Sequence, residues 1–164
     1  ALTRATDLGL LQDAVLAQSE RERAAFWAIR DNIESLAALW PLAIFDISLP
    51  LASMEDYLER TGARLQQRLG TLRWITFGHL GDSNLHLAVA LDGDDPAARH
   101  AVEEIVYGGL AGIGGSVSAE HGIGLEKREF LHCSRSDAEI ELMKTLKRAL
   151  DSRNILNPGR IFRL

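Results

Sequence analysis

Apolar residues in the first seventy positions mostly recur at the three- and four-residue spacing of amphipathic helices. The spacing predicts helices over three ranges: 7–18, 19–39 and about 53–70. Asp7 is a suitable N-cap for the first, and Ser53 begins a Ser-x-x-Asp capping box for the third. Pro41 ends the second helix, and residues 42–49 form a β-rich run that we predict to be a strand.

The second half of the chain contains two β-rich runs, 71–77 and 85–91, separated by the turn-forming sequence Gly-Asp-Ser-Asn. This composition predicts an antiparallel hairpin with His79 and His86 at its tip. The pattern then predicts four further elements: a helix over 97–109, a short strand over 116–119, a helix from about 125 and a helix over 137–150.

Helices and strands therefore alternate around a central hairpin. We predict an α+β fold with a mostly antiparallel sheet and helices packed on one face. At 164 residues the chain has the usual size of one domain and is long enough to bury a core. We expect residues 1–164 to form a single domain.

Composition narrows the class of protein. With 46% hydrophobic and 25% charged residues, the chain has the composition of an ordinary globular domain. A net charge of −5 without a dense Lys/Arg stripe argues against nucleic-acid binding. No apolar run approaches the ~18 residues of a membrane span. The single cysteine, Cys133, excludes an internal disulfide and indicates a reducing compartment, so we expect a cytoplasmic location, with any membrane contact peripheral.

Two glycine-containing runs hold the candidate chemistry: Gly-His-Leu-Gly-Asp-Ser-Asn-Leu-His at 78–86 and Ser-Ala-Glu-His-Gly-Ile-Gly at 118–124. His79 and His86 are seven residues apart, so one straight strand cannot present both on one face, whereas a turn can bring them together. Two imidazoles and a third ligand would leave open positions on a metal ion, as a catalytic site requires. A lone histidine is more often structural, and we interpret His100 and His132 in that way.

These two runs and a third, Ile-Leu-Asn-Pro-Gly-Arg at 155–160, resemble the signature stretches of the C-terminal domain of FAD-linked 2-hydroxyacid dehydrogenases. That family lies within the vanillyl-alcohol oxidase superfamily and includes D-lactate dehydrogenase, D-2-hydroxyglutarate dehydrogenase and the glycolate oxidase flavin subunit. The run Phe-Trp-Ala-Ile-Arg at 26–30 is a fourth match. The resemblance implies a ferredoxin-like cap domain that binds substrate and metal.

The resemblance also implies roles for single residues. The implied ligands of a divalent metal, zinc first with manganese or iron as alternatives, are His79, His86 and Glu120. Arg30 would clamp the substrate carboxylate, and Asn157 would contact the cofactor. His121 would act as general base while the 2-hydroxy acid passes hydride to the flavin and becomes a 2-oxo acid. Glu120 and His121 can serve one pocket only if the following glycines bend the chain.

The sequence contains no glycine-rich strand-turn-helix loop of the kind that cradles a dinucleotide phosphate. We therefore expect FAD to be bound mainly by an upstream domain of the same polypeptide, with an electron acceptor completing the cycle. Outside the matched roles, we interpret Asp82 and Asn84 as turn residues. We interpret Lys127 and Arg128 as solvated helix charges.

Departures from the family pattern bear on the substrate. Ser83 replaces a usual glycine, which a turn tolerates. Where enzymes resembling D-2-hydroxyglutarate dehydrogenase carry lysine, asparagine and threonine, this chain has Ile44, Ala88 and Glu34. Since these changes remove polar contacts to a distal carboxylate or add negative charge, we expect a monocarboxylic, lactate- or glycolate-like D-2-hydroxy acid as substrate. The alternatives are a stand-alone metal hydrolase built on the same ligands and a non-catalytic ferredoxin-like binding module.

Overall fold

The computed structural model describes residues 2–164; Ala1, the first residue of the predicted single domain, lies outside the described residues. The chain divides into two compact units, Ala1–Ala38 and Leu39–Leu164. Each unit is described by itself below, and the single domain over 1–164 stays a prediction. No helix among residues 2–164 combines the length and the apolar character that crossing a membrane demands.

The first unit contains α1 (Leu2–Asp7) and α2 (Glu20–Asp31), and the 3₁₀-helix Ile33–Leu39 begins at its end. Ser19 caps α2 by accepting a hydrogen bond from the backbone N–H of Glu22. The predicted helix over 7–18 is wrong, because α1 ends where the prediction begins and 8–18 contain no helix. Little packing stabilises a helix there, since Leu11 is only partly buried and four other large apolar side chains are 61–78% exposed; these are Leu8, Leu10, Val15 and Leu16.

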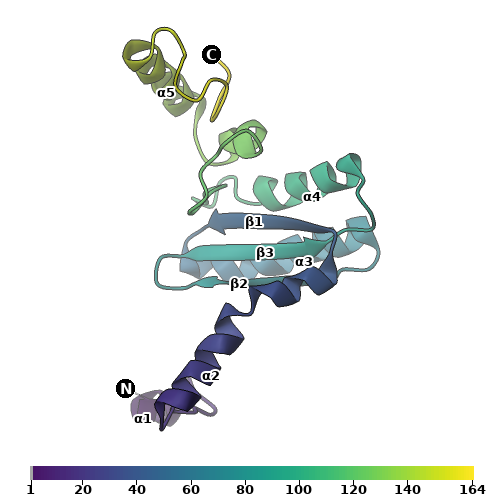
Figure 1. The fold of residues 1–164 in the computed structure, drawn as a ribbon, viewed down its shortest axis with the longest axis vertical. Coiled ribbons are helices and arrows are strands. Elements are labelled where there is room, and N and C mark those ends of the chain that lie inside the picture. Colours follow the sequence, from purple (N-terminus) through teal and green to yellow (C-terminus); the bar gives the residue numbers. More distant parts are fainter. Residues whose placement is uncertain (1) are drawn as a thin grey trace. The chain divides into compact units, whose positions relative to one another are not determined.

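The second unit is built around a three-stranded antiparallel sheet in the order β1-β3-β2 (Figure 1). Its elements are β1 (Leu42–Ser48), α3 (Met54–Leu69), β2 (Trp74–His79), β3 (Asn84–Ala90), α4 (Pro96–Gly108), the 3₁₀-helix η3 (Lys127–Cys133) and α5 (Asp137–Leu150). The α+β class, the central hairpin and the antiparallel sheet are therefore confirmed.

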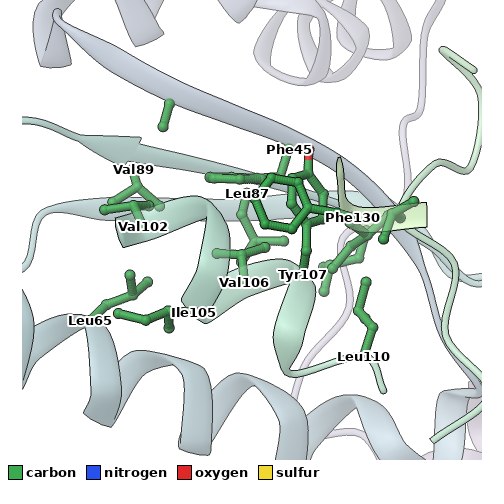
Figure 2. Close-up of a cluster of buried hydrophobic side chains, with 14 of the residues drawn as sticks. Phe45, Leu65, Leu87, Val89, Val102, Ile105, Val106, Tyr107, Leu110 and Phe130 are labelled. Carbon is green, nitrogen blue, oxygen red and sulfur yellow. The ribbon is translucent and has the colours of Figure 1, made fainter. Parts of the chain in front are cut away.

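The hydrophobic core lies on one face of the sheet. Alternate strand residues such as Phe45, Leu87 and Val89 are at most 1% exposed and pack with side chains of both long helices, among them Leu65 of α3 and Val106 of α4 (Figure 2). A cluster that joins two helices to one set of strand positions places those helices on a single face of the sheet. The sequence prediction of helices on one face is confirmed.

The element order β-α-β-β-α and the strand order match a ferredoxin-like unit whose fourth strand is almost absent. The predicted strand over 116–119 is reduced to one bridge, in which Ser48 and Ser116 exchange backbone hydrogen bonds. Beyond Ser116 the chain leaves the ladder, because the N–H groups of Glu120 and His121 bond to the Asp46 side chain. This departure from strand geometry shapes the candidate site.

Other element boundaries also differ from the predictions. Ser53 precedes α3, but its side chain makes no capping hydrogen bond. The helix predicted from about 125 is the short 3₁₀-helix η3. In contrast, α4 begins close to the predicted residue and is capped by Asp95, and α5 begins at a complete capping box between Ser136 and Glu139.

Candidate functional site

The second face of the sheet is open and carries the polar side chains of the strands. Register places Asp46 opposite His86 and His86 opposite Phe77 across the three strands. Because strand side chains alternate, His86 points away from the core that holds Leu85 and Leu87. The open face is therefore where the hairpin presents its chemistry.

The hairpin brings the two predicted histidines together. β2 ends at His79, and the His79 and His86 rings lie 5.9 Å apart in an edge-on arrangement. Gly78 permits the tight pairing beside them, since a Cβ there would lie 2.2 Å from the carbonyl oxygen of Asn84. Meeting at one point is what the sequence predicted for this pair.

Glu120 completes a three-residue cluster. One ligand atom from each of His79, His86 and Glu120 lies within 4.8 Å of the others, and His79 Nε2 is 3.7 Å from Glu120 Oε1. Two ligands of one tetrahedral zinc ion lie roughly 3.4 Å apart, so these positions fit a metal with little movement. The His79 and Glu120 side chains are 43% and 47% exposed, which leaves the outer side of the cluster accessible to a small molecule.

Asn84 is a buried residue that contacts the cluster. Its side chain donates a 2.6 Å hydrogen bond to Glu120 Oε1, and the residue is 2% exposed. The turn interpretation is wrong for Asn84, because its side chain crosses to the second run instead of bonding its own turn. It holds for Asp82, which accepts a hydrogen bond from the backbone N–H of Asn84.

His121 lies next to the metal cluster without belonging to it. Its ring stacks on His86 with 6.1 Å between centroids, and its Nδ1 is 3.7 Å from Asp46 Oδ2. Gly122 and Gly124 have φ of 76° and 57°, so the predicted bend after His121 is confirmed. A carboxylate beside Nδ1 favours the tautomer with the proton there, which leaves Nε2 free to accept one.

Asp46 is the centre of a buried network that the sequence interpretation did not anticipate. Its carboxylate is 1% exposed and accepts hydrogen bonds of 2.8–3.3 Å from the backbone N–H groups of Glu120 and His121, the Ser118 hydroxyl and the Lys127 ammonium. Lys127 is 8% exposed and also donates to the Asp46 carbonyl oxygen. The interpretation of Lys127 as a solvated charge is therefore wrong.

The network has a consequence for the protonation of Asp46. Burial raises the pKa of this carboxyl, but the backbone N–H groups of His121 and Glu120 and the charge of Lys127 outweigh burial and lower the pKa from 3.8 to about 2. Burial also lowers the pKa of Lys127, and the negative charge of Asp46 opposes that shift. Asp46 is thus an anion in the folded protein over the whole neutral range.

We expect this carboxylate to make the fold sensitive to acid. A folded-state pKa below the unfolded one stabilises the fold above about pH 4, and the contribution, about 2 kcal/mol, is lost as the pH falls from about 4 to about 2. Denaturant unfolding at several pH values from 2 to 6 should show a steeper loss of the free energy of unfolding in wild type than in the double variant Asp46→Asn/Lys127→Met. The exposed Asp94→Asn variant is the control. Equal slopes in wild type and double variant would contradict the expectation.

Asp46, Glu120 and His121 also lie close enough together to suggest a second metal site. The Lys127 ammonium, however, is 3.3 Å from Asp46 Oδ2, and the backbone N–H groups of Glu120 and His121 already bond to the same carboxylate. A cation would have to displace Lys127 from a buried ion pair. The cluster of His79, His86 and Glu120 is the better metal site.

A cavity of about 640 Å³ adjoins the site along the edge of β1 that the missing fourth strand leaves free. Ile44 and His121 both line it. The cavity is also lined by the basic residues Arg99, Lys127 and Arg160 and by the acidic residues Glu103 and Glu126. A substrate held beside His121 therefore has room to extend past Ile44.

Arg30 and Asn157 are described by their own surroundings. Arg30 lies in the first unit, where it contacts Asp31 at 2.7 Å and lies over the Trp27 ring, and its substrate role stays a prediction. Asn157 has φ of 48°, a conformation that asparagine tolerates. Its segment is attached to the second unit by hydrogen bonds from Arg128 Nη1 to the Gly159 carbonyl oxygen and from the Ile161 N–H to the Gly124 carbonyl oxygen. Arg128 is thus also more than a solvated charge.

Sequence reasoning missed Asp46, Asn84 and Lys127 as parts of the site. Their partners are distant along the chain; Asp46 and Lys127, for example, are separated by 81 residues. One local signal existed for Asp46, since a charged residue stands in the middle of an otherwise apolar strand. Lys127 offers no such signal, because it lies among other charged residues.

Known proteins are similar to this chain over nearly its whole length. Residues 1–161 match the family model described as FAD linked oxidases, C-terminal domain. The chain belongs to this family. The match covers both histidines of the hairpin, the Glu120-His121 turn and the Asn157 segment, so all of the site described here lies inside the family's domain.

Individual relatives are similar over nearly the whole chain. The chain is 36% identical over 159 residues to D-2-hydroxyglutarate dehydrogenase of Stutzerimonas stutzeri, covering 94% of this chain and 34% of the relative. It is 39% identical over 158 residues to the mitochondrial enzyme of that name from Bos taurus, covering 96% and 29%. A Schizosaccharomyces pombe mitochondrial protein provisionally named a D-lactate dehydrogenase is 35% identical over 159 residues, covering 91% and 30%. The chain spans about a third of the length of these relatives.

Proposed function

We propose that this chain is the metal- and substrate-binding domain of a flavin-dependent dehydrogenase that oxidises a D-2-hydroxy acid to the 2-oxo acid. The observation that carries the proposal is the convergence of His79, His86 and Glu120 beside His121 on the open face of the sheet. The family match and relatives named as 2-hydroxy acid dehydrogenases support it. They favour it over a stand-alone hydrolase or a binding module, since neither alternative accounts for the flavin-linked family.

The donor set fits a divalent metal. Two imidazole nitrogens and one carboxylate suit zinc, manganese or ferrous iron, with zinc the first choice. A bound metal would supply Lewis acidity, lowering the pKa of a hydroxyl group that approaches it. The three residues that would hold the ion come from the end of β2, from β3 and from the Glu120 turn, and three protein ligands would leave a position for substrate.

His121 is the proposed general base. Asp46 Oδ2 lies 3.7 Å from its Nδ1, which favours a proton on that nitrogen and leaves Nε2 to take the proton of the substrate hydroxyl. The stacked His86 ring limits how the His121 ring can turn. The His121 side chain is 61% exposed, so a substrate can reach the imidazole that these contacts orient.

The flavin would receive the hydride when bound. The described residues do not form a phosphate cradle for it, since α2 to α5 begin after Ser19, Ser53, Asp95 and Ser136 instead of after glycine-rich turns. We therefore propose that FAD is held mainly by an upstream domain of the same polypeptide. In this chain Asn157 is the proposed cofactor contact, and Arg30 is proposed to bind the substrate carboxylate next to the reacting carbon. An electron acceptor then reoxidises the flavin.

We propose further that the acid is monocarboxylic. Ile44 and Ala88 are direct partners across β1 and β3 on the open face, and Ile44 lines the cavity next to His121. Neither side chain can donate a hydrogen bond to a distal carboxylate. A second charge buried against Ile44, the accessible member of this pair, would gain no partner from it, and an unpaired buried charge costs several kcal/mol.

The test is flavin reduction followed by stopped flow in the full-length protein. D-lactate or a longer monocarboxylic D-2-hydroxy acid should exceed D-2-hydroxyglutarate in kcat/KM by about a hundredfold. Ile44→Lys should narrow the difference, whereas Ile75→Lys, on the same face at the other edge of the sheet, should not. Ala88→Asn is a second step, because Ala88 is fully buried and a larger side chain needs room.

Two other results would contradict these proposals in different ways. Preference for D-2-hydroxyglutarate would remove the monocarboxylate assignment and direct attention to Arg160, which lines the same cavity. Failure of every 2-hydroxy acid to reduce the flavin would remove the proposed function itself.

A further inference from the structure

The turn at Glu120 and His121 supplies a proposed metal ligand and the proposed general base from consecutive residues, so its backbone has to be held in one conformation. Glu120 and His121 point to one site only because the chain bends after them, and no strand ladder holds this segment. Both residues are exposed at their side chains. Asn84 bonds the Glu120 carboxylate and His86 stacks on the His121 ring, but the course of the turn itself has to be fixed through its backbone.

The backbone N–H groups of Glu120 and His121 end on the same side chain. Asp46 Oδ2 accepts from Glu120 at 3.0 Å and from His121 at 2.8 Å. Asp46 lies in the middle of β1, with its side chain opposite His86. The turn that carries one metal ligand is thus attached to the strand that neighbours another.

Lys127 fixes the position of Asp46. Its ammonium bonds to the Asp46 carbonyl oxygen at 3.0 Å, to Oδ2 at 3.3 Å and to the Ser118 hydroxyl at 3.1 Å. Ser118 also donates to the Gly122 carbonyl oxygen at 3.0 Å. These bonds join β1, both sides of the turn and the 3₁₀-helix η3 into one hydrogen-bonded frame.

We propose that Asp46, with Lys127 as its charge partner, is a positioning residue that sets the Glu120 carboxylate toward the metal and the His121 ring toward the substrate. This inference rests on the proposed metal site. The frame preorganises groups that would otherwise have to be ordered when metal and substrate bind. Removing a group that orients a metal ligand in this way typically weakens metal affinity by about 10- to 100-fold.

The experiment measures zinc affinity of the 164-residue chain by competition with a chromophoric chelator. Asp46→Asn/Lys127→Met, which removes the charge pair together, should weaken affinity tenfold or more. Lys127→Met alone keeps the carboxylate and both backbone bonds but leaves the buried charge of Asp46 without its partner, so zinc affinity should fall by less than in the double variant. Thr61→Ala, at a buried position in α3, is the control for lost stability and should bind zinc as wild type does. Wild-type affinity in the double variant would overturn the proposal.

Amide proton shifts provide a second readout that needs no metal. In ¹H–¹⁵N spectra the amide resonances of Glu120 and His121 should move upfield in the double variant and stay in place in Thr61→Ala. Unchanged shifts in the double variant would overturn the role of Asp46. If wild type binds no zinc, the proposed metal site fails, and the amide shifts alone then decide whether Asp46 holds the turn.

Discussion

Replacing His86 with alanine should lower divalent-metal affinity by more than about a hundredfold, because it removes one of the three proposed protein ligands. Loss of a residue that merely orients a ligand already costs about 10- to 100-fold, and loss of the ligand itself should cost more. His86 points off the open face of the sheet, and the substitution therefore leaves the core unchanged. The measurement is zinc, manganese and ferrous iron binding by calorimetry and by metal analysis of the purified protein.

The control for this prediction is His100→Ala. His100 is a half-exposed residue of α4, 3.6 Å and 3.7 Å from the carboxylates of Glu103 and Glu104, and it is not part of the cluster. Its replacement should leave metal affinity unchanged. Equal affinities in wild type and His86→Ala would show that the metal does not bind at the hairpin, and a loss in His100→Ala alone would move the site to α4.

Replacing His121 with asparagine should reduce kcat of the full-length enzyme by about a hundredfold to ten-thousandfold. That is the usual contribution of a positioned general base, and the variant cannot accept the proton at Nε2. Metal affinity should be preserved, since the metal cluster consists of His79, His86 and Glu120. Steady-state kinetics and metal binding on the same preparation separate a base from a ligand.

His132→Asn is the matched control for this second prediction. Its Nδ1 is within hydrogen-bond distance of the Glu129 carbonyl oxygen in η3, and the residue plays no part in the cluster. The control should retain wild-type kcat. A His121→Asn enzyme with unchanged kcat would remove the assigned base, whereas loss of both kcat and metal would reassign His121 as a ligand.

The sequence predicts those parts of the fold that short-range patterns determine. The hairpin is one, since its Gly-Asp-Ser-Asn turn and flanking β-rich runs lie within a few residues of one another. The capped helices α4 and α5 are others. The helix over 7–18 fails for the opposite reason: its apolar spacing is helical, but Leu10 and Val15 have nothing to pack against. Periodicity describes what a segment could bury and cannot supply the surface that buries it.

The site divides in the same way. The two histidines are predictable because one turn joins them, and the resemblance supplied Glu120. The Asp46–Lys127 frame is not predictable, since its value depends on a carboxylate and an ammonium meeting across most of the unit. A lysine among charged residues is usually exposed to solvent. Here burial against one carboxylate overrides that expectation.

Because β2 and β3 pair closely at Gly78, the number of residues between the two histidines determines whether both face the same side of the sheet. β2 and β3 are in register from His79 opposite Asn84 onward, and side chains alternate between faces along β3. One residue added between 84 and 86 would turn His86 toward the core, although every ligand would still be present in the sequence. Related proteins should therefore differ in the residues of this turn but keep the number of residues between the two histidines. A sequence search for sites of this kind should weight the spacing of the histidines above the identity of the residues between them.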